Sequence, residues 1–314
     1  MPRCISLLLA AASCLFAQST PPEIRFDYSD PLHPPEGFNL GEAAGIAVNS
    51  KGHIFVFERG IRARLHEFDQ NGKYLREIGK DLYGFSFAHV VRIDKDDNIW
   101  CVDEGSNMVI EFTPQGKVIM LLGRKPEAVE APPAREGIPP ARPNTFNRPT
   151  DVTWDTDGNA YIADGYNNSR VAKVSKDGDW IKAWGKRGTD PGDFHTVHSI
   201  AIDNQNRLYV GDRENNRIQV FDTDGKFLKA FTNVGAPWAV CITPGPKQVL
   251  YTSDSRVGKF YKLDLDGNIL GTFGKAGHKP GTFGWVHEIS CPSENVLFVG
   301  ELLNWRVQKL VLHP

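Results

Sequence analysis

One pattern of short strands repeats six times along the chain, and this repetition restricts the fold more than any other feature. Segments 150–184 and 198–231 align with each other. Each has two apolar runs joined by a turn, then an acidic residue and a polar loop, then two more runs joined by an Asp-Gly turn. Alternating apolar residues between Asp/Asn/Gly turns are typical of β-hairpins. The unit recurs around the anchor residues Ile46, Val91, Val152, Ile200, Val240 and Ile289.

These repeats predict an all-β fold, a six-bladed β-propeller. Four strands per repeat, at a period of 40 to 61 residues, are the signature of propeller blades. The sixth repeat stops after its third strand, whereas "EIRFDYS" at 23–29 has strand character without a repeat of its own. We therefore predict one domain over residues 18–314, in which this N-terminal strand completes the last blade. Closing the ring in this way removes an exposed strand edge.

The first residues have the character of a signal peptide. Arg3 precedes "CISLLLAAASCLFA", which is too short to span a bilayer. We predict a signal peptide over residues 1–17, cleavage after Ala17 and export to the periplasm or the medium. The alternative is a lipoprotein acylated at Cys14. Because no later apolar segment is long enough for a membrane helix, no membrane span is expected.

Charge and cysteine content argue against two further classes of protein. With 36 Lys and Arg residues against 38 Asp and Glu residues, the formal net charge is -2, and no basic run stands out. The sequence therefore predicts no nucleic-acid partner. Beyond the signal peptide, Cys101, Cys241 and Cys291 lie in apolar runs. An odd number of cysteines so placed predicts three buried free thiols rather than a disulfide framework.

Three histidines stand at the same place in alternate repeats. His89, His198 and His287 begin the first strand of repeats two, four and six. Alternate blades of a six-fold ring are related by a three-fold rotation, so the three imidazoles should converge on the axis. Three imidazoles with an open fourth position are typical of catalytic Zn²⁺, although nitrogen ligands also suit Cu, Fe and Ni. A single histidine at this position would instead be interpreted as a residue that caps its strand through a backbone hydrogen bond. The odd repeats carry Ala44, Thr150 and Trp238 there.

The loops after the second strands add polar residues on the same face. Arg59 and Arg213 are equivalent in repeats one and four, and Tyr166 lies in the matching loop of repeat three. Arginine suits a carboxylate, and tyrosine can act as a general base where a cation lowers its pKa. Each alone is an ordinary loop residue, but beside a metal they predict a carboxylate-binding site. Glu288 could hold a second cation or orient a ligand.

Several phrases of the sequence resemble known families. "NNSRV", "NNRIQ" and "NWRVQ" resemble NHL repeats, and this resemblance covers the whole mature chain. "DGYNNSRV" at 164–171 and "DRENNRIQ" at 212–219, together with "PTDV", "VHSIA" and "VHEI", resemble peptidylglycine α-amidating lyase. The resemblance implies cleavage of peptidyl α-hydroxyglycine to a peptide amide and glyoxylate. It also implies a small-molecule or peptide substrate with a C-terminal α-hydroxyglycine, and we expect a monomer.

The resemblance further implies roles for individual residues. Tyr166 matches the proposed base, and Arg59 and Arg213 match the active-site arginines of the family. The residues that match its zinc ligands are His89, His198 and His287. A structural calcium ion is implied at an acid matching Glu288 and at backbone carbonyls matching Ile46 and Val91.

The sequence also departs from the family. Glu288 stands where the family has Asp, which weakens the expectation of calcium, and Trp285 stands where Met is expected. The insert 124–149 is long for a loop between blades and is predicted to act as a lid or to restrict the substrate. The family positions of animal disulfides carry no cysteine here and are Asn147, Asn167, Tyr209 and Val220.

Two other functions compete with the lyase hypothesis. The first is a non-catalytic exported NHL propeller that binds a protein or small-molecule partner. The second is a calcium-dependent propeller hydrolase of the lactonase type. Sites of that type use carboxylates and Asn rather than three histidines, so this alternative ranks last.

Overall fold

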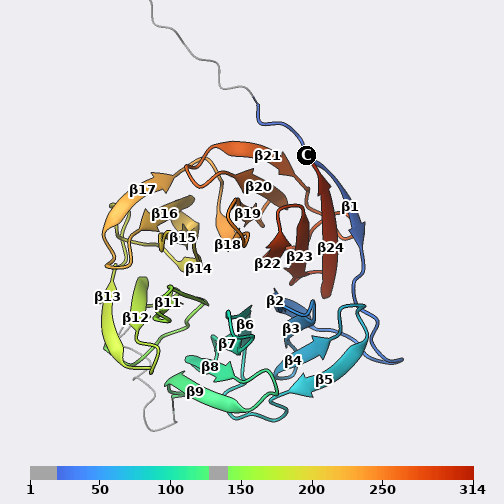
Figure 1. Cartoon of the computed structure of the whole chain (residues 1–314), viewed down its shortest axis with the longest axis horizontal. Helices are drawn as coiled ribbons and strands as arrows, with labels where there is room; N and C mark the ends of the chain where they lie inside the picture. The colour runs from blue at the N-terminus through green and yellow to red at the C-terminus, as the bar shows by residue number, and fades with distance from the viewer. Residues whose placement is uncertain (1–19, 127–140) are drawn as a thin grey trace, which may run out of the picture.

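The computed structural model describes residues 20–126 and 141–314, which form a ring of six four-stranded antiparallel sheets (Figure 1). The first blade contains β2 (Glu42–Val48), β3 (Ile54–Arg59), β4 (Ala63–Phe68) and β5 (Tyr74–Ile78). The second contains β6 (Ala88–Ile93), β7 (Ile99–Asp103), β8 (Met108–Phe112) and β9 (Val118–Gly123). The third contains β10 (Asp151–Trp154), β11 (Ala160–Asp164), β12 (Arg170–Val174) and β13 (Trp180–Trp184).

The remaining three blades follow the same order. The fourth contains β14 (Val197–Ile202), β15 (Leu208–Asp212), β16 (Arg217–Phe221) and β17 (Phe227–Phe231), with the short 3-10 helix η1 (Arg213–Asn215) between β15 and β16. The fifth contains β18 (Pro237–Ile242), β19 (Leu250–Asp254), β20 (Lys259–Leu263) and β21 (Ile269–Phe273). The sixth contains β22 (Val286–Ser293), β23 (Val296–Glu301), β24 (Arg306–His313) and β1 (Arg25–Ser29). The predicted six-bladed propeller is confirmed.

The N-terminal strand closes the ring as the sequence predicts. β1 pairs antiparallel with β24, from Arg25 opposite His313 to Ser29 opposite Lys309. The sheet order is therefore β1-β24-β23-β22, so the first described strand is the outermost strand of the last blade. Ile24 is buried beside this strand, and the ring of Phe26 lies 5.6 Å from that of Phe273 in the fifth blade. Closure thus buries apolar surface as well as a strand edge.

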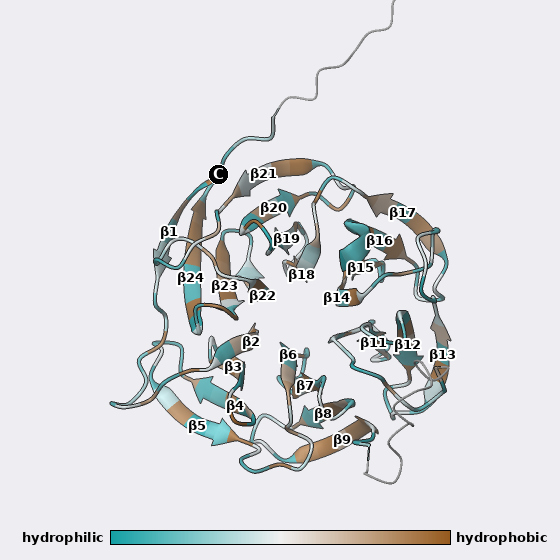
Figure 2. Cartoon of the chain, turned by 180° about the vertical axis from the view of Figure 1, so that it is seen from behind, coloured by the Kyte–Doolittle hydropathy of each residue, from teal (hydrophilic) through white to brown (hydrophobic). Residues whose placement is uncertain are grey.

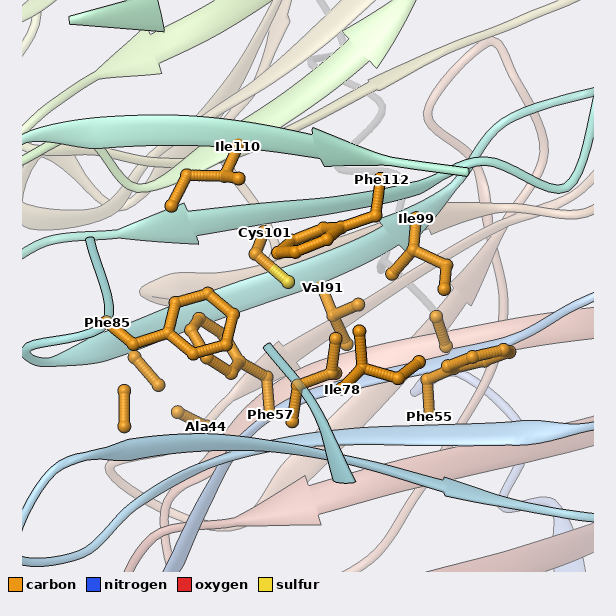
Figure 3. Close-up of a cluster of buried hydrophobic side chains, with 14 of the residues drawn as sticks. Ala44, Phe55, Phe57, Ile78, Phe85, Val91, Ile99, Cys101, Ile110 and Phe112 are labelled. Atoms are coloured by element: carbon orange, nitrogen blue, oxygen red, sulfur yellow. The ribbon is translucent and has the colours of Figure 1, made fainter. Parts of the chain in front are cut away.

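The core consists of apolar layers between neighbouring blades. Figure 3 shows the layer between the first and second blades, where Phe57, Phe85 and Phe112 surround Cys101. The rings of Phe57 and Phe85 are 4.8 Å apart. Viewed from behind, every blade carries brown, apolar segments (Figure 2). Because each layer is shared by two blades, a single blade could not bury its apolar faces alone.

The structure corrects the cysteine prediction in part. Cys101 is buried and free, as expected. Cys241 and Cys291 were predicted to be free thiols, and this is wrong because they form a disulfide between β18 and β22. The two cysteines are 50 residues apart, which is about one repeat. That spacing places them at similar heights on the innermost strands of adjacent blades.

Two predictions fall on parts of the chain that lie outside the described residues. These parts are residues 1–19, with the signal peptide, Cys14 and the cleavage site, and residues 127–140 of the insert. Export and the lid role therefore stay predictions. Across the described ranges, no helix has the length and apolar character needed to cross a membrane.

Removing the closing strand should destabilise the whole ring. Deletion of residues 20–29 exposes the edge of β24 and the apolar partners of Ile24 and Phe26. We expect the Tm to fall by about 5–10 °C, measured by differential scanning calorimetry. The control is Asp27→Asn on the same strand, which removes an exposed pair with His313 and should leave the Tm nearly unchanged. An unaltered Tm in the deletion variant would contradict ring closure as a source of stability.

Candidate metal centre

The structure brings the three predicted histidines together at the axis. Each of His89, His198 and His287 offers a ring nitrogen, and these atoms all lie within 4.8 Å of one another. The ring centroids are 4.5 to 5.0 Å apart, and all three side chains are buried. We call these residues the histidine cluster. It comes from the starts of β6, β14 and β22, on three alternate blades (Figure 1).

A β-bulge directs each histidine of the cluster. The register of β6 with β7 jumps from Ala88 to Val90, so His89 has no partner in the pairing. The same jump passes over His198 in β14 and His287 in β22. A bulge inserts one residue into a strand and re-aims its side chain. It therefore lets these residues face the axis while the rest of each strand keeps its regular pairing.

Hydrogen bonds to the neighbouring blades orient two of the imidazoles. Nδ1 of His198 lies 2.6 Å from the carbonyl oxygen of Trp238, and Nδ1 of His287 lies 2.8 Å from that of Ala44. Because a carbonyl only accepts, Nδ1 carries the proton in both rings. Nε2 then keeps its lone pair, and in His198 this buried atom has no hydrogen-bond partner among residues 20–126 and 141–314. Within the same ranges, neither ring nitrogen of His89 has one.

Electrostatics keeps the cluster uncharged. Burial is the main cause that holds the pKa of His89 well below its usual range, followed by the neighbouring histidines. Burial also holds the pKa of His198 and the pKa of His287 well below the usual range. The next cause is the charge of Arg213 for His198 and the charge of Arg59 for His287. Neutral imidazoles are the ligand form that Zn²⁺ and related divalent metals require. The donor set therefore fits such a metal.

The two predicted arginines and the tyrosine lie beside the cluster. Nη2 of Arg59 is 3.5 Å from Nε2 of His287, and its Nε donates to the carbonyl of Ala88 at 2.7 Å. Nη1 of Arg213 lies 3.4 Å from the hydroxyl oxygen of Tyr166. The Tyr166 ring is 5.7 Å from that of His89. Burial raises the pKa of Tyr166, and Arg213 acts against this shift.

Sequence reasoning missed a buried acid in this site. Glu104 follows β7, and its Oε2 lies 3.7 Å from Nη2 of Arg59 and 3.9 Å from Nε2 of His89. Nε of Arg148 donates to Glu104 at 2.7 Å, and its guanidinium stacks over the Tyr166 ring at 4.7 Å. Glu104 occupies in the second blade the place that Arg59 holds in the first. Alignment of the repeats by position could have found it, although a search for arginines could not.

The residues predicted for calcium lie together, and the carboxylate of Glu288 contacts nitrogen groups. Oε2 of Glu288 accepts from the backbone N–H of Ile46 at 2.9 Å and of Val91 at 3.4 Å. Nη1 of Arg92 lies 3.1 Å from its Oε1. Calcium takes six to eight oxygen ligands, whereas this carboxylate is surrounded by N–H groups and a guanidinium. These contacts of the Glu288 carboxylate do not favour calcium, but they do not involve the carbonyls of Ile46 and Val91, so the calcium site stays a prediction.

A polar network around Arg92 connects the inner strands of all six blades. Arg92 forms two hydrogen bonds with Asp151, of 2.9 and 2.6 Å. Oδ2 of Asp151 also accepts from the hydroxyl of Ser199, and that hydroxyl accepts from the N–H of Val240. With Glu288 and Ile46, the network includes β2, β6, β10, β14, β18 and β22. We call it the axial network.

Direct contacts occupy the positions where the family resemblance places disulfides. Nδ2 of Asn167 donates to Oδ1 of Asn147 at 2.8 Å. Tyr209 and Val220 are paired across β15 and β16. Each pair is close in space, so a hydrogen bond and a cross-strand contact stand where covalent links are expected in the family.

Comparisons with known proteins agree with this architecture. The NHL repeat family matches residues 146–174 and 194–221. Peptidyl-glycine alpha-amidating monooxygenase A of Xenopus laevis is 29% identical over 84% of this chain and 31% of its own length. NHL repeat-containing protein 3 of Homo sapiens is 29% identical over 77% of this chain and 67% of its own. A probable peptidyl-alpha-hydroxyglycine alpha-amidating lyase of Caenorhabditis elegans is 26% identical over 87% of this chain and 83% of its own. The chain thus spans about a third of the Xenopus protein.

The histidine cluster should determine metal content. We expect about one zinc ion per chain in protein purified with zinc and dialysed. His89→Ala, His198→Ala or His287→Ala should each reduce it to near zero, measured by inductively coupled plasma mass spectrometry. His195→Ala is the control, because this nearby ring lies against Arg187. Full zinc occupancy in all three cluster variants would refute the site.

The axial network should stabilise the ring without calcium. Arg92→Ala leaves two buried carboxylates unpaired, which typically destabilises a protein by about 3–5 kcal/mol, so we expect a Tm lower by about 6–15 °C. Excess Ca²⁺ should not raise the Tm of the parent protein. Lys95→Ala, which removes an exposed pair with Asp96, is the control with little expected change. A Tm raised by Ca²⁺, together with an unchanged Tm in Arg92→Ala, would favour calcium instead.

Proposed function

Because the chain is an NHL-repeat β-propeller that resembles peptidyl-α-hydroxyglycine α-amidating lyases, we propose that it is a zinc-dependent lyase. The reaction splits the C–N bond of a peptidyl α-hydroxyglycine, giving a peptide amide and glyoxylate. The observation that carries this proposal is the buried histidine cluster with a tyrosine and two arginines beside it. His89, His198 and His287 would hold the zinc ion.

The arginines suit the terminal carboxylate of such a substrate. The side chains of Arg59 and Arg213 are mostly buried, and they approach the histidine cluster from the first and fourth blades. Glu42 and Glu104 lie within 3.4 and 3.7 Å of Arg59 and hold its guanidinium in place. A carboxylate bound between the two arginines places the adjacent hydroxyl at the histidine cluster. Holding the reacting groups in this way lowers the entropic part of the barrier.

Tyr166 is placed to accept the proton of that hydroxyl. Zinc, when bound, would supply Lewis-acid polarisation of the hydroxyl group. The phenol lies beside Arg213, whose charge favours the phenolate against the effect of burial on the pKa. A zinc ion held by the histidine cluster, whose His89 ring lies 5.7 Å from the Tyr166 ring, would act in the same direction.

The proposed step balances without a co-reactant. The hydroxyl proton moves to Tyr166, the C–O bond becomes the carbonyl of glyoxylate, and the C–N bond breaks. The departing amide nitrogen then takes the proton back from Tyr166. No group is oxidised or reduced, and Arg59 and Arg213 neutralise the carboxylate throughout.

A second function remains an alternative. The chain is also similar over most of its length to human NHL repeat-containing protein 3, whose name gives no lyase activity. The alternative is therefore an NHL propeller that binds a partner without catalysis. Such a protein would need neither the three bulged histidines nor the buried Tyr166. Release of glyoxylate by the purified protein separates the two functions.

The assay for this proposal is glyoxylate release from N-benzoyl-α-hydroxyglycine by the zinc-loaded protein. Tyr166→Phe should lower kcat by a factor of roughly 10² to 10⁴, as loss of a general base typically does, with zinc retained. Tyr261→Phe, in β20 of the fifth blade, is the control with parental activity. Arg213→Ala should raise KM as well as lower kcat, because it removes a carboxylate contact.

Two outcomes would change the proposal in different ways. If the zinc-loaded parent protein releases no more glyoxylate than the metal-free protein, the lyase function is refuted. If the parent is active and Tyr166→Phe is equally active, another group accepts the proton. Glu104, buried beside His89, is then the first residue to replace.

A further inference from the structure

Exposed apolar side chains are distributed unevenly around the ring. Among the described residues, eight of the fifteen large ones lie on β1, β5, β9, β13, β17, β21 and β24. The other seven lie in loops on the face that carries the histidine cluster, in blades one, two, five and six. They are Ile61, Tyr83, Phe87, Val257, Trp285, Leu303 and Trp305. The same loops of blades three and four carry none within the described residues.

Two of these side chains adjoin the histidine cluster. Phe87 and Trp285 each stand two residues before a histidine of the cluster, and they are 41% and 44% exposed. The guanidinium of Arg59 stacks over the Phe87 ring at 4.1 Å. Trp285 lies 5.4 Å from Trp238, and Trp238 lies 5.3 Å from His198, between ring centroids. We call Trp238 and Trp285 the aromatic wall.

The backbone holds Trp285 in an unusual conformation. Its φ is 53°, in the left-handed region that bulky residues rarely adopt. Its carbonyl accepts the N–H of Leu302 at 3.0 Å. This bond fixes the segment before β22 against the loop between β23 and β24 of the same blade. The equivalent residues Arg148 and Thr196 have φ values of 61° and 68°, so this turn is a feature of the repeat. What distinguishes Trp285 is a large apolar side chain left 44% exposed at this position.

Trp238 offers an unused donor at the base of the wall. It occupies in the fifth blade the bulge position that the histidines occupy in the even blades. Arg213 stacks over its ring at 4.7 Å. Its buried Nε1 has no hydrogen-bond partner among the described residues. Buried donors without a partner are rare, and a polar group of a ligand lying against the wall would satisfy this one.

We infer that the aromatic wall binds the acyl side of the substrate and favours an aromatic or large apolar group next to the α-hydroxyglycine. This inference rests on the proposed function. With the carboxylate at Arg59 and Arg213 and the hydroxyl at the histidine cluster, the acyl group must leave the site toward solvent. The wall supplies an apolar surface on that route, whereas the matching place in the fourth blade carries the small Thr196.

Equilibrium binding tests the wall without catalysis. N-benzoylglycine and N-acetylglycine share a carboxylate and an amide, and they differ in the aromatic ring. We expect zinc-loaded protein to bind the benzoyl compound about tenfold more tightly or better, measured by isothermal titration calorimetry. Trp285→Ala should reduce this ratio to about threefold or less by removing the outer ring of the wall. Trp285→Leu, which keeps an apolar side chain but removes the ring, gives a second reduction should Trp285→Ala fail to fold.

Trp305→Ala is the matched control. Trp305 belongs to the same blade, has a φ of 50° and is 60% exposed. It lines a separate pocket with Leu32 and Phe38, near the segment that follows β1. The tenfold ratio should persist in this variant. A similar loss in Trp305→Ala and Trp285→Ala would overturn the assignment to the wall.

Glyoxylate release from N-benzoyl- and N-acetyl-α-hydroxyglycine separates the two proposals. If both substrates are cleaved with equal kcat/KM and both glycines bind equally, the lyase stands and the wall is refuted. A benzoyl preference that Trp285→Ala abolishes, in both binding and kcat/KM, supports the wall. If binding shows this preference but no glyoxylate is released, the lyase is refuted and the wall remains a site for aromatic carboxylates.

Discussion

The geometry of the centre depends on a largely buried guanidinium that lies between the inner strands of the ring. Arg92 lies between Asp151 and Glu288, and charges so placed are tolerated only when they are paired. The axial network connects the first strands of all six blades, one to three residues along from the histidine cluster. Glu288 directly follows His287, for example, and Ser199 directly follows His198. The charges that hold the strands together therefore also fix the height and angle of the imidazoles.

The β-bulges direct the three histidine side chains of this rigid ring toward one point. A regular strand start would direct each side chain alternately to one face of its blade, between blades rather than toward the axis. One extra residue at His89, His198 and His287 directs three rings to one point. The equivalent residues Ala44 and Trp238 in the odd blades then accept hydrogen bonds through their carbonyls. Even and odd blades thus have different tasks: the even blades supply the three rings, and two of the odd blades orient the rings of His198 and His287.

Structural features that recur from blade to blade could be predicted from the sequence. Six blades, the closing strand and the convergence of the histidines all follow from period and position, because each blade places equivalent residues at equivalent points. Features that depend on two different blades were harder to foresee. The Cys241–Cys291 disulfide and the pairing of Arg92 with Glu288 need the ring to be closed before their partners are neighbours. Glu104 was missed because it occupies the position that Arg59 has in the first blade but carries an acid instead of a guanidinium.

Ring closure also has a consequence for how the protein is made. β1 pairs with β24, so the most distant parts of the described chain must meet, with Arg25 opposite His313. Contacts of such long sequence separation form late. The chain loses conformational entropy when the loop closes, before the contact contributes any stabilisation. His287 lies in this last blade. During synthesis from the N-terminus, the third imidazole arrives only with the last blade, so a nascent chain that lacks this blade has an incomplete histidine cluster. Completion of the cluster is in this way coupled to completion of the ring.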